Sequence, residues 1–143
     1  MSETPRGIDE GGDLAVAAIS LSNIPYKQIF CVDFEFQAPA GERPRPLCMV
    51  ARELRTGREW RLWRNELTAL KRAPFDTGPD ALFIAYSAGA ELGCFLELGW
   101  PLPERVVDLL AENRVQINGL RLPQGLGDGL LGALAMRPRS HRR

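Results

Sequence analysis

The stretch Phe30–Phe36, Phe-Cys-Val-Asp-Phe-Glu-Phe, holds two carboxylates in an otherwise apolar run. Successive side chains of a β-strand point to opposite faces, so Asp33 and Glu35 are expected to share one face with Cys31, while the phenylalanines face a core. Two neighbouring carboxylates repel each other and are costly to desolvate unless a cation neutralises them. Oxygen ligands suit a hard divalent ion, Mg²⁺ or Mn²⁺. The alternative is an exposed strand whose polar face lies in water.

The composition is that of one globular domain, with 143 residues, 45% of them hydrophobic and 25% charged. The formal net charge is zero, which neither favours nor excludes a nucleic-acid partner. The odd number of cysteines, three, and their lack of metal-ligand spacing predict small core residues in a reducing compartment. The sequence contains neither an apolar run of membrane-spanning length nor a secretory signal pattern, so we expect a cytoplasmic protein without a membrane partner.

Local patterns divide the chain into three parts. Residues 1–26 are small and polar and predict a disordered or weakly structured lead-in, residues 27–136 a folded domain, and residues 137–143 a basic tail. Strands are expected at about 28–37, 47–53 and 59–63, with Gly57 at a positive φ in the turn between the last two. These three strands predict an antiparallel meander.

The second half of the domain alternates helix and strand. A helix over 66–72 capped by Asn65 precedes a fully apolar strand over 81–85, which is typical of a buried, parallel strand. Ser87 is a candidate cap for a helix over 88–98, and a short strand over 105–108 leads into a helix that reaches about Asn113. An apolar helix begins at Leu130, and its pattern stops at Met136. The fold class is therefore α/β, with a mixed sheet of the ribonuclease H-like type, flanking helices and an incomplete C-terminus.

Two motifs in this order resemble those of the DEDD-type 3′–5′ exonuclease domains, the ribonuclease H-like modules of proofreading family A DNA polymerases. Val32-Asp33-Phe34-Glu35 matches the first motif of that family, a strand-borne Asp-x-Glu. The second motif is Asn-x-x-x-Asp at the start of a helix after a buried strand. Ser87 takes the Asn position here and Glu91 the Asp position, so neither is the family's own residue. The resemblance covers about residues 28–135.

The resemblance implies metal-dependent phosphodiester hydrolysis. Asp33, Glu35 and Glu91 would be the catalytic and metal-ligating residues, with Mg²⁺ or Mn²⁺ as cofactor and Ser87 near the nucleic acid. The implied partners are a single-stranded DNA 3′ end and a polymerase domain or subunit. Asp108 resembles a supporting residue of such domains, or else it caps a helix. For Glu91 the alternative is a solvated residue in the first turn of a helix, favoured by the helix dipole.

The family's third motif, Tyr-x-x-x-Asp or His-x-x-x-x-Asp on a final helix, has no counterpart. No acidic residue follows Asp128, and His141, the only histidine, has no Asp after it. Two-metal hydrolysis shares several carboxylates between two ions, so the loss of one weakens the site that generates the nucleophile. Two further hypotheses therefore stand beside an active nuclease. One is a catalytically inactive module that binds nucleic acid or a polymerase partner, and the other is a remnant of a truncated or frame-shifted exonuclease gene.

Arginine and tryptophan alternate through the second and third predicted strands. Arginine contacts phosphates, and aromatic rings stack on unpaired bases, so Arg58 and Arg61 are candidate nucleic-acid contacts. The alternative is an ordinary solvated surface, because Glu53 and Glu59 interrupt the basic pattern. The residues concerned are Arg52, Arg55, Arg58, Arg61 and Arg64, with Trp60 and Trp63.

Overall fold

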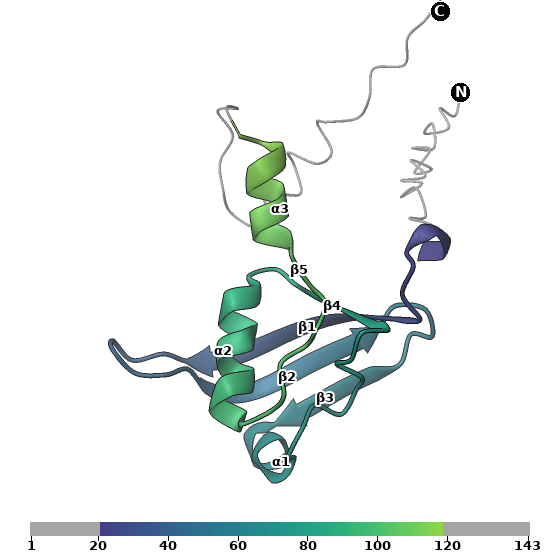
Figure 1. The fold of residues 1–143 in the computed structure, drawn as a ribbon. Helices are drawn as coiled ribbons and strands as arrows, with labels where there is room; N and C mark the ends of the chain where they lie inside the picture. Colours follow the sequence, from purple (N-terminus) through teal and green to yellow (C-terminus); the bar gives the residue numbers. More distant parts are fainter. Residues whose placement is uncertain (1–20, 119–143) are drawn as a thin grey trace, which may run out of the picture.

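A computed structural model of the protein describes residues 21–118, which form a five-stranded mixed sheet of order β3-β2-β1-β4-β5 (Figure 1). β1 is antiparallel to β2 and β2 to β3, whereas β4 is parallel to both β1 and β5. The predicted α/β class, with an antiparallel meander followed by parallel strands, is confirmed. The strands are β1 (Gln28–Gln37), β2 (Arg45–Glu53), β3 (Glu59–Trp63), β4 (Ala81–Ala85) and β5 (Val106–Asp108).

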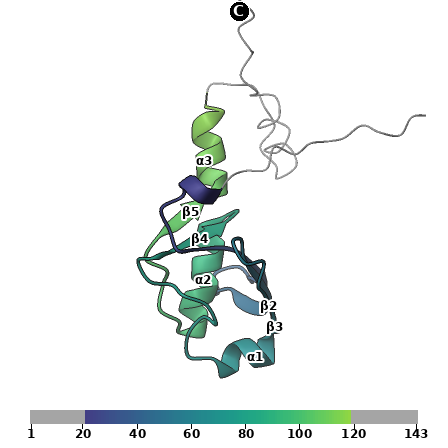
Figure 2. The ribbon, with the colours of Figure 1, turned by 90° about the vertical axis from the view of Figure 1, so that its right-hand side faces the viewer.

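Four helical segments accompany the sheet: a 3₁₀ turn (Leu21–Asn23), α1 (Arg64–Ala69), α2 (Ala88–Leu98) and α3 (Leu109–Gln116). α2 lies across one face of the sheet, and α1 follows directly from the end of β3 (Figure 1). α3 extends away from the sheet, as Figures 1 and 2 both show, and it contains no buried residue. No helix within 21–118 is long and apolar enough to cross a membrane.

The core lies between α2 and the face of the sheet that carries the phenylalanines of β1. Phe30, Val32 and Phe34 are buried there, with Ala51 and Met49 of β2 opposite the last two. The aromatic rings form two groups along β1. One lies under α2, and the other lies near the segment 70–77 that follows α1. The rings are Phe34, Phe83, Phe95 and Trp100 in the first group, and Phe30, Trp60 and Phe75 in the second.

The other face of β1 to β3 is much less covered. Asp33 and Glu35 are exposed on it, and Val50 and Cys48 are their neighbours on β2. The predicted alternation of β1 is therefore confirmed. The prediction that all three cysteines are core residues is right for the buried Cys94, whereas Cys31 and Cys48 are only half-buried; all three are free thiols.

β2 begins two residues earlier than the sequence predicts, at Arg45 instead of 47, and it includes Pro46. Pro46 pairs with Phe36 just after a register shift between Glu35 and Phe36. A bulge of this kind interrupts the ladder, which lets a strand tolerate a residue that has no N–H to donate.

α1 also differs from its prediction. It runs from Arg64 to Ala69, so Asn65 is a helical residue and not the cap. Glu66 instead accepts a hydrogen bond from the Trp63 backbone N–H, at 2.8 Å. The helix ends early because Leu70 is extended, with its carbonyl oxygen accepting from the Trp100 indole at 3.0 Å. A contact with a residue 30 positions away therefore decides the end of this helix.

The turn between β2 and β3 forms as predicted, with Gly57 at φ 76°, a conformation that side chains with a Cβ rarely adopt. Arg55 in this turn donates to the backbone oxygens of Ile24 and Tyr26, each at 2.8 Å, and so holds the segment that enters β1. The rest of the predicted lead-in, the apolar helix at 130–136, His141 and the basic tail lie outside the described residues.

Candidate functional site

Asp33 and Glu35 lie side by side on the exposed face of β1, as the alternation of the strand requires. Neither takes part in any of the ion pairs found between residues 21 and 118. Asp33 lines a hollow of about 280 Å³ at the carboxyl end of β4, with Cys31, Arg52, Tyr86 and Leu109 among its other walls. The carboxyl ends of parallel strands are where open α/β sheets usually bind ligands.

Glu91 reaches the same strand from the first turn of α2. Its side chain is only 5% exposed, so the interpretation as a solvated helix residue is wrong. Its Oε2 accepts a hydrogen bond from the backbone N–H of Phe34 at 3.0 Å. β4 pairs with β1 only as far as Cys31, so this N–H lies beyond the paired part of that edge. Glu91 therefore satisfies a backbone donor that no strand reaches.

The surroundings of Glu91 raise its pKa to about 7. Burial is the largest cause, and the negative charges of Asp33 and Glu35 add to it, whereas the Phe34 N–H opposes the shift. Glu91 in turn adds to the effect of burial on Cys94, whose thiol pKa rises to about 12. The charges of Asp33 and Glu35 therefore act on the Glu91 carboxyl group, although Glu91 comes from α2, which covers the other face of the sheet.

These three residues have the chemical groups that bind a divalent cation, but their arrangement is not that of a metal site. Carboxylate oxygens suit Mg²⁺ or Mn²⁺, and a cation would relieve the repulsion that Asp33 and Glu35 exert on Glu91. However, the part of the chain that the structure describes contains no group of three or more His, Cys, Asp or Glu side chains placed to hold a metal ion. Asp33 and Glu35 project from one face of β1, and Glu91 is hydrogen-bonded at its edge.

Ser87 occupies the N-cap position of α2, as predicted, but its side chain does not cap the helix. The carboxylate of Asp108 does so instead, because its Oδ2 accepts from the Ala88 N–H at 3.0 Å. Its Oδ1 accepts from the Ala111 N–H at 2.9 Å and caps α3. The alternative role of Asp108, as the cap of the helix that follows it, is thus confirmed for α3. Its bond to the N-terminus of α2 was not predicted from the sequence.

Asp108→Ala is expected to lower the free energy of unfolding by about 2 kcal/mol, because two helix N-termini lose their acceptor. Asp108→Asn keeps one acceptor oxygen and should lose about half as much. Urea unfolding followed by circular dichroism measures both. Glu112→Ala, an exposed position in the first turn of α3, is the control and should stay within about 0.5 kcal/mol of the parent. An alanine variant as stable as the parent would contradict the double cap.

The structure separates Arg58 from Arg61. The Arg58 guanidinium lies over the ring of Trp60, 4.7 Å from its centroid. Arg61 lies in the cross-strand row of Val50 and Asp33, where its guanidinium is bonded to Glu59. Within the described residues the two arginines therefore do not form one basic strip.

Glu53 is a residue whose role the sequence did not reveal. It is 2% exposed and accepts hydrogen bonds from the backbone N–H groups of Ile29, Arg55 and Thr56 and from the Thr56 hydroxyl. The available signal was its position just before a tight turn, where N–H groups lack ladder partners.

In the comparisons with known proteins, no family model matches this chain, and no curated protein matches it either.

Proposed function

We propose that the chain is a 3′–5′ exonuclease-like domain of ribonuclease H-like fold that hydrolyses the phosphodiester bond at the 3′ end of single-stranded DNA, with Mg²⁺ or Mn²⁺ as cofactor. Asp33, Glu35 and Glu91 are its acidic residues. The polarity and the DNA substrate follow from the resemblance of the two motifs. The proposal extends to association with a polymerase domain or subunit.

The observation that carries this proposal is the contact between Glu91 and β1. Asp33 and Glu35 flank Phe34 in the sequence, and the Glu91 carboxylate is hydrogen-bonded to the N–H of that residue. This hydrogen bond joins the first motif, on β1, to the second motif, at the start of α2, across 57 positions of the sequence. The two motifs follow each other in the order that the resemblance requires. A role of Glu91 in stability alone would not require two further acids beside it.

The sheet and its hollow add support. The antiparallel meander β1 to β3 and the parallel strands β4 and β5 follow the arrangement that the resemblance implies. Asp33 lines the hollow at the carboxyl end of β4, where the Arg52 guanidinium lies 3.5 Å from the Glu59 carboxylate that lines the same hollow and would exchange this ion pair for a phosphate. Asp33 and Glu35, with Glu91, would hold the cation. When bound, such an ion lowers the pKa of a coordinated water and stabilises charge on the phosphate oxygens.

The test is a titration of the purified chain with Mn²⁺ against a 3′-labelled single-stranded oligonucleotide. Cleavage that saturates with the ion is expected, and Asp33→Asn should abolish it. Glu97→Gln, an exposed position of α2, is the matched control and should cleave like the parent. A 3′-blocked oligonucleotide should resist. Mn²⁺ binding followed by electron paramagnetic resonance gives a readout besides activity. Cleavage that survives in Asp33→Asn would overturn the assignment of the site.

A second candidate, a nucleic-acid-binding module without hydrolysis, is favoured by one observation. No group of three potential ligands is placed to hold a metal among residues 21–118. This candidate predicts DNA binding that weakens with salt, with no cleavage at any Mn²⁺ concentration. A cooperatively unfolding chain that binds DNA, does not cleave it and binds no Mn²⁺ would decide in its favour.

A further inference from the structure

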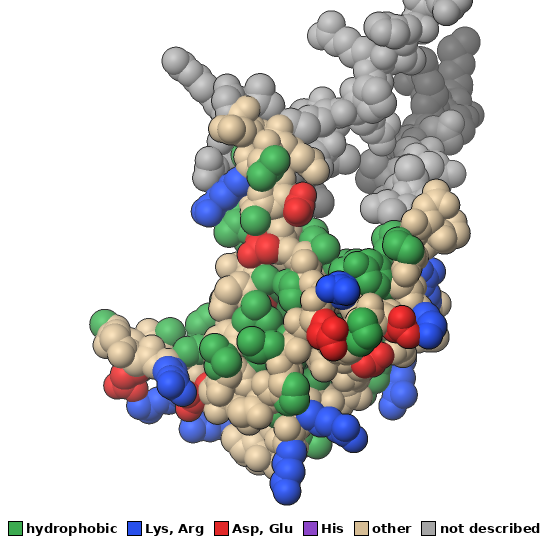
Figure 3. All heavy atoms as spheres, viewed as in Figure 1, with side chains coloured by type: hydrophobic (Ala, Val, Ile, Leu, Met, Phe, Trp, Pro, Cys, Tyr) green, Lys and Arg blue, Asp and Glu red, His purple; other side chains and the backbone are tan. Residues whose placement is uncertain are grey.

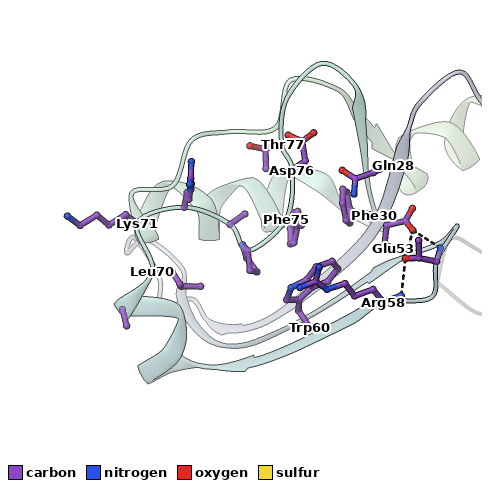
Figure 4. A pocket seen from close by; sticks show the side chains of 15 residues that line it. Gln28, Phe30, Glu53, Arg58, Trp60, Leu70, Lys71, Phe75, Asp76 and Thr77 are labelled. Carbon is purple, nitrogen blue, oxygen red and sulfur yellow. Dashed lines mark hydrogen bonds between the residues drawn. The ribbon is translucent and has the colours of Figure 1, made fainter.

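A second and larger hollow, of about 790 Å³, lies away from the acidic residues (Figure 4). Phe30 and Trp60 face it from the sheet, which places it on the core side, opposite to the exposed Asp33 and Glu35. The segment that follows α1 forms its other wall. The lining residues used below are Gln28, Arg58, Trp60, Lys71, Arg72 and Phe75, with Thr77 and the acids Glu53 and Asp76.

The floor of this hollow is aromatic. The rings of Trp60 and Phe75 meet edge to face with centroids 5.8 Å apart, and Phe30 stacks on Phe75 at 4.9 Å. Phe30 and Phe75 are 1% and 9% exposed and support the third ring from behind, whereas Trp60 is half-buried and so keeps part of its ring open. The three rings come from β1, β3 and the segment after α1, as Figure 4 shows. The floor is therefore a supported aromatic surface that is only partly covered.

The rim is positively charged. Arg58, Lys71 and Arg72 are exposed, and none of them takes part in an ion pair within the described chain. Of the acids, Glu53 is already bonded to four donors, and Asp76 accepts from the N–H of Gly78 in its own turn. Basic side chains gather on the surface around α1, as Figure 3 shows. An anionic ligand thus finds unpaired cations there.

Arg58 joins the rim to the floor. Its guanidinium lies over the Trp60 ring, so one face of the guanidinium plane is stacked and the other face is free for a base. The guanidinium N–H groups stay available for a phosphate. A base can stack on an aromatic ring or on an arginine plane, and the same arginine can contact a phosphate. Gln28 and Thr77 line the same hollow and offer an amide and a hydroxyl group to the edge of a base.

We propose that this hollow binds a nucleotide unit, with its base on the Trp60–Arg58 surface and its phosphate at Arg72 and Lys71, the flexible Lys71 side chain turning inward from the outward direction drawn in Figure 4. The volume lies within the roughly 300–1,000 Å³ of typical small-molecule sites. The ligand is either a free mononucleotide or one unit of a single strand, since both offer the same base and phosphate. This site goes beyond the proposed hydrolysis, because it needs no metal and uses none of Asp33, Glu35 or Glu91.

Calorimetric titration of the full chain in EDTA tests the site, with thymidine monophosphate in one arm and oligothymidylate in the other. At least one arm should show binding. Lys71→Glu and Arg58→Ala should each weaken it about tenfold or more, because each removes a charge-assisted contact. The matched control is Arg43→Glu, an exposed charge reversal in the loop between β1 and β2 that does not line the hollow.

The mononucleotide and oligonucleotide titrations distinguish a site for a free nucleotide from a site for a single strand. Binding in both arms or only of the mononucleotide identifies a free-nucleotide site, and binding of the oligonucleotide alone identifies a strand site. In a Trp63→Phe background, quenching of the tryptophan fluorescence should accompany either, and a further Trp60→Phe change should remove the quenching because only the buried Trp100 then remains. No binding in either arm by a cooperatively folded chain overturns the proposal, as does equal weakening by Arg43→Glu. Since EDTA removes the cation, failure here is distinct from failure of the proposed hydrolysis.

Discussion

Glu53→Ala is expected to lower the free energy of unfolding by about 4 kcal/mol, a large share of the roughly 5–15 kcal/mol of a small domain. The carboxylate accepts from three backbone N–H groups and one hydroxyl, at 2.6 to 3.1 Å, and its removal leaves these donors without their partner. The Ile29 contact joins the end of β2 to the start of β1, and the others close the turn before β3. The loss therefore loosens both hairpin turn and central strand.

The pH dependence of Glu53 provides a second readout. Its four donors outweigh burial, which alone would raise the pKa, and they lower that pKa to about 2 from an ordinary value of 4.5. The unfolded chain thus binds the proton more readily, so the stabilisation is complete above pH 4.5 and is lost as the pH falls toward 2. Glu53 itself is covered, but the turn residues Thr56 and Gly57 beside it are exposed, so solvent screens part of this stabilisation and we expect about 2 kcal/mol.

Urea unfolding of the parent, Glu53→Ala and Glu53→Gln at several pH values measures both effects. Gln keeps the size of the side chain but turns an amide toward N–H donors, so it should fall between the other two in stability. Glu59→Gln is the control on the adjacent strand, where exposed ion pairs with Arg52 and Arg61 predict a change below about 1 kcal/mol. Equal losses at positions 53 and 59 would contradict the role of the buried network.

Glu91 is expected to make stability depend on pH in the direction opposite to Glu53, and Glu91→Gln is expected to remove that dependence. The Glu91 pKa of about 7 lies above its ordinary 4.5, so the folded chain binds the proton more readily than the unfolded chain. The parent should therefore lose stability as the pH rises from 4.5 through 7, by about 3 kcal/mol. Gln keeps an acceptor for the Phe34 N–H without the charge, so the variant should lack this loss and should be the more stable protein at pH 8.

The measurement is the difference in unfolding free energy between parent and variant, in EDTA, at pH 4.5, 6, 7 and 8. Taking the difference removes the contributions of the titrating groups that do not interact with Glu91. Glu97→Gln on the exposed side of α2 is the matched control. A constant difference for Glu91→Gln would mean that neither burial nor the charges of Asp33 and Glu35 raise the pKa of this carboxyl group.

The elements that the sequence predicted well are those whose pattern is local. β1, β3, β4 and α2 have the expected bounds, because apolar alternation, a fully apolar run and a glycine at the helix end each specify one conformation. α1 ends earlier than predicted, at Ala69, and the carbonyl oxygen of the following residue, Leu70, accepts from the Trp100 indole 30 positions away. No local propensity carries that information.

The same distinction applies to the candidate site. The shared face of Asp33 and Glu35 follows from strand geometry alone, whereas the burial of Glu91 depends on β4 ending before β1 does. The roles of Glu53 and Asp108 depend on donors 24 and 20 residues away. Their local bonds, from Arg55 and Thr56 to Glu53 and from Ala111 to Asp108, leave a signal in the sequence, whereas the bonds from Ile29 and Ala88 leave none.

The order of strands has a consequence for self-association. The two longest strands, β1 and β2, are interior, while the outer positions belong to β3, with five residues, and β5, with three. An outer strand exposes unpaired N–H and C=O groups that can template the addition of another chain, and short or charged outer strands limit this. β3 also carries Glu59 and Arg61. The described sheet therefore offers little template for fibril growth at its edges.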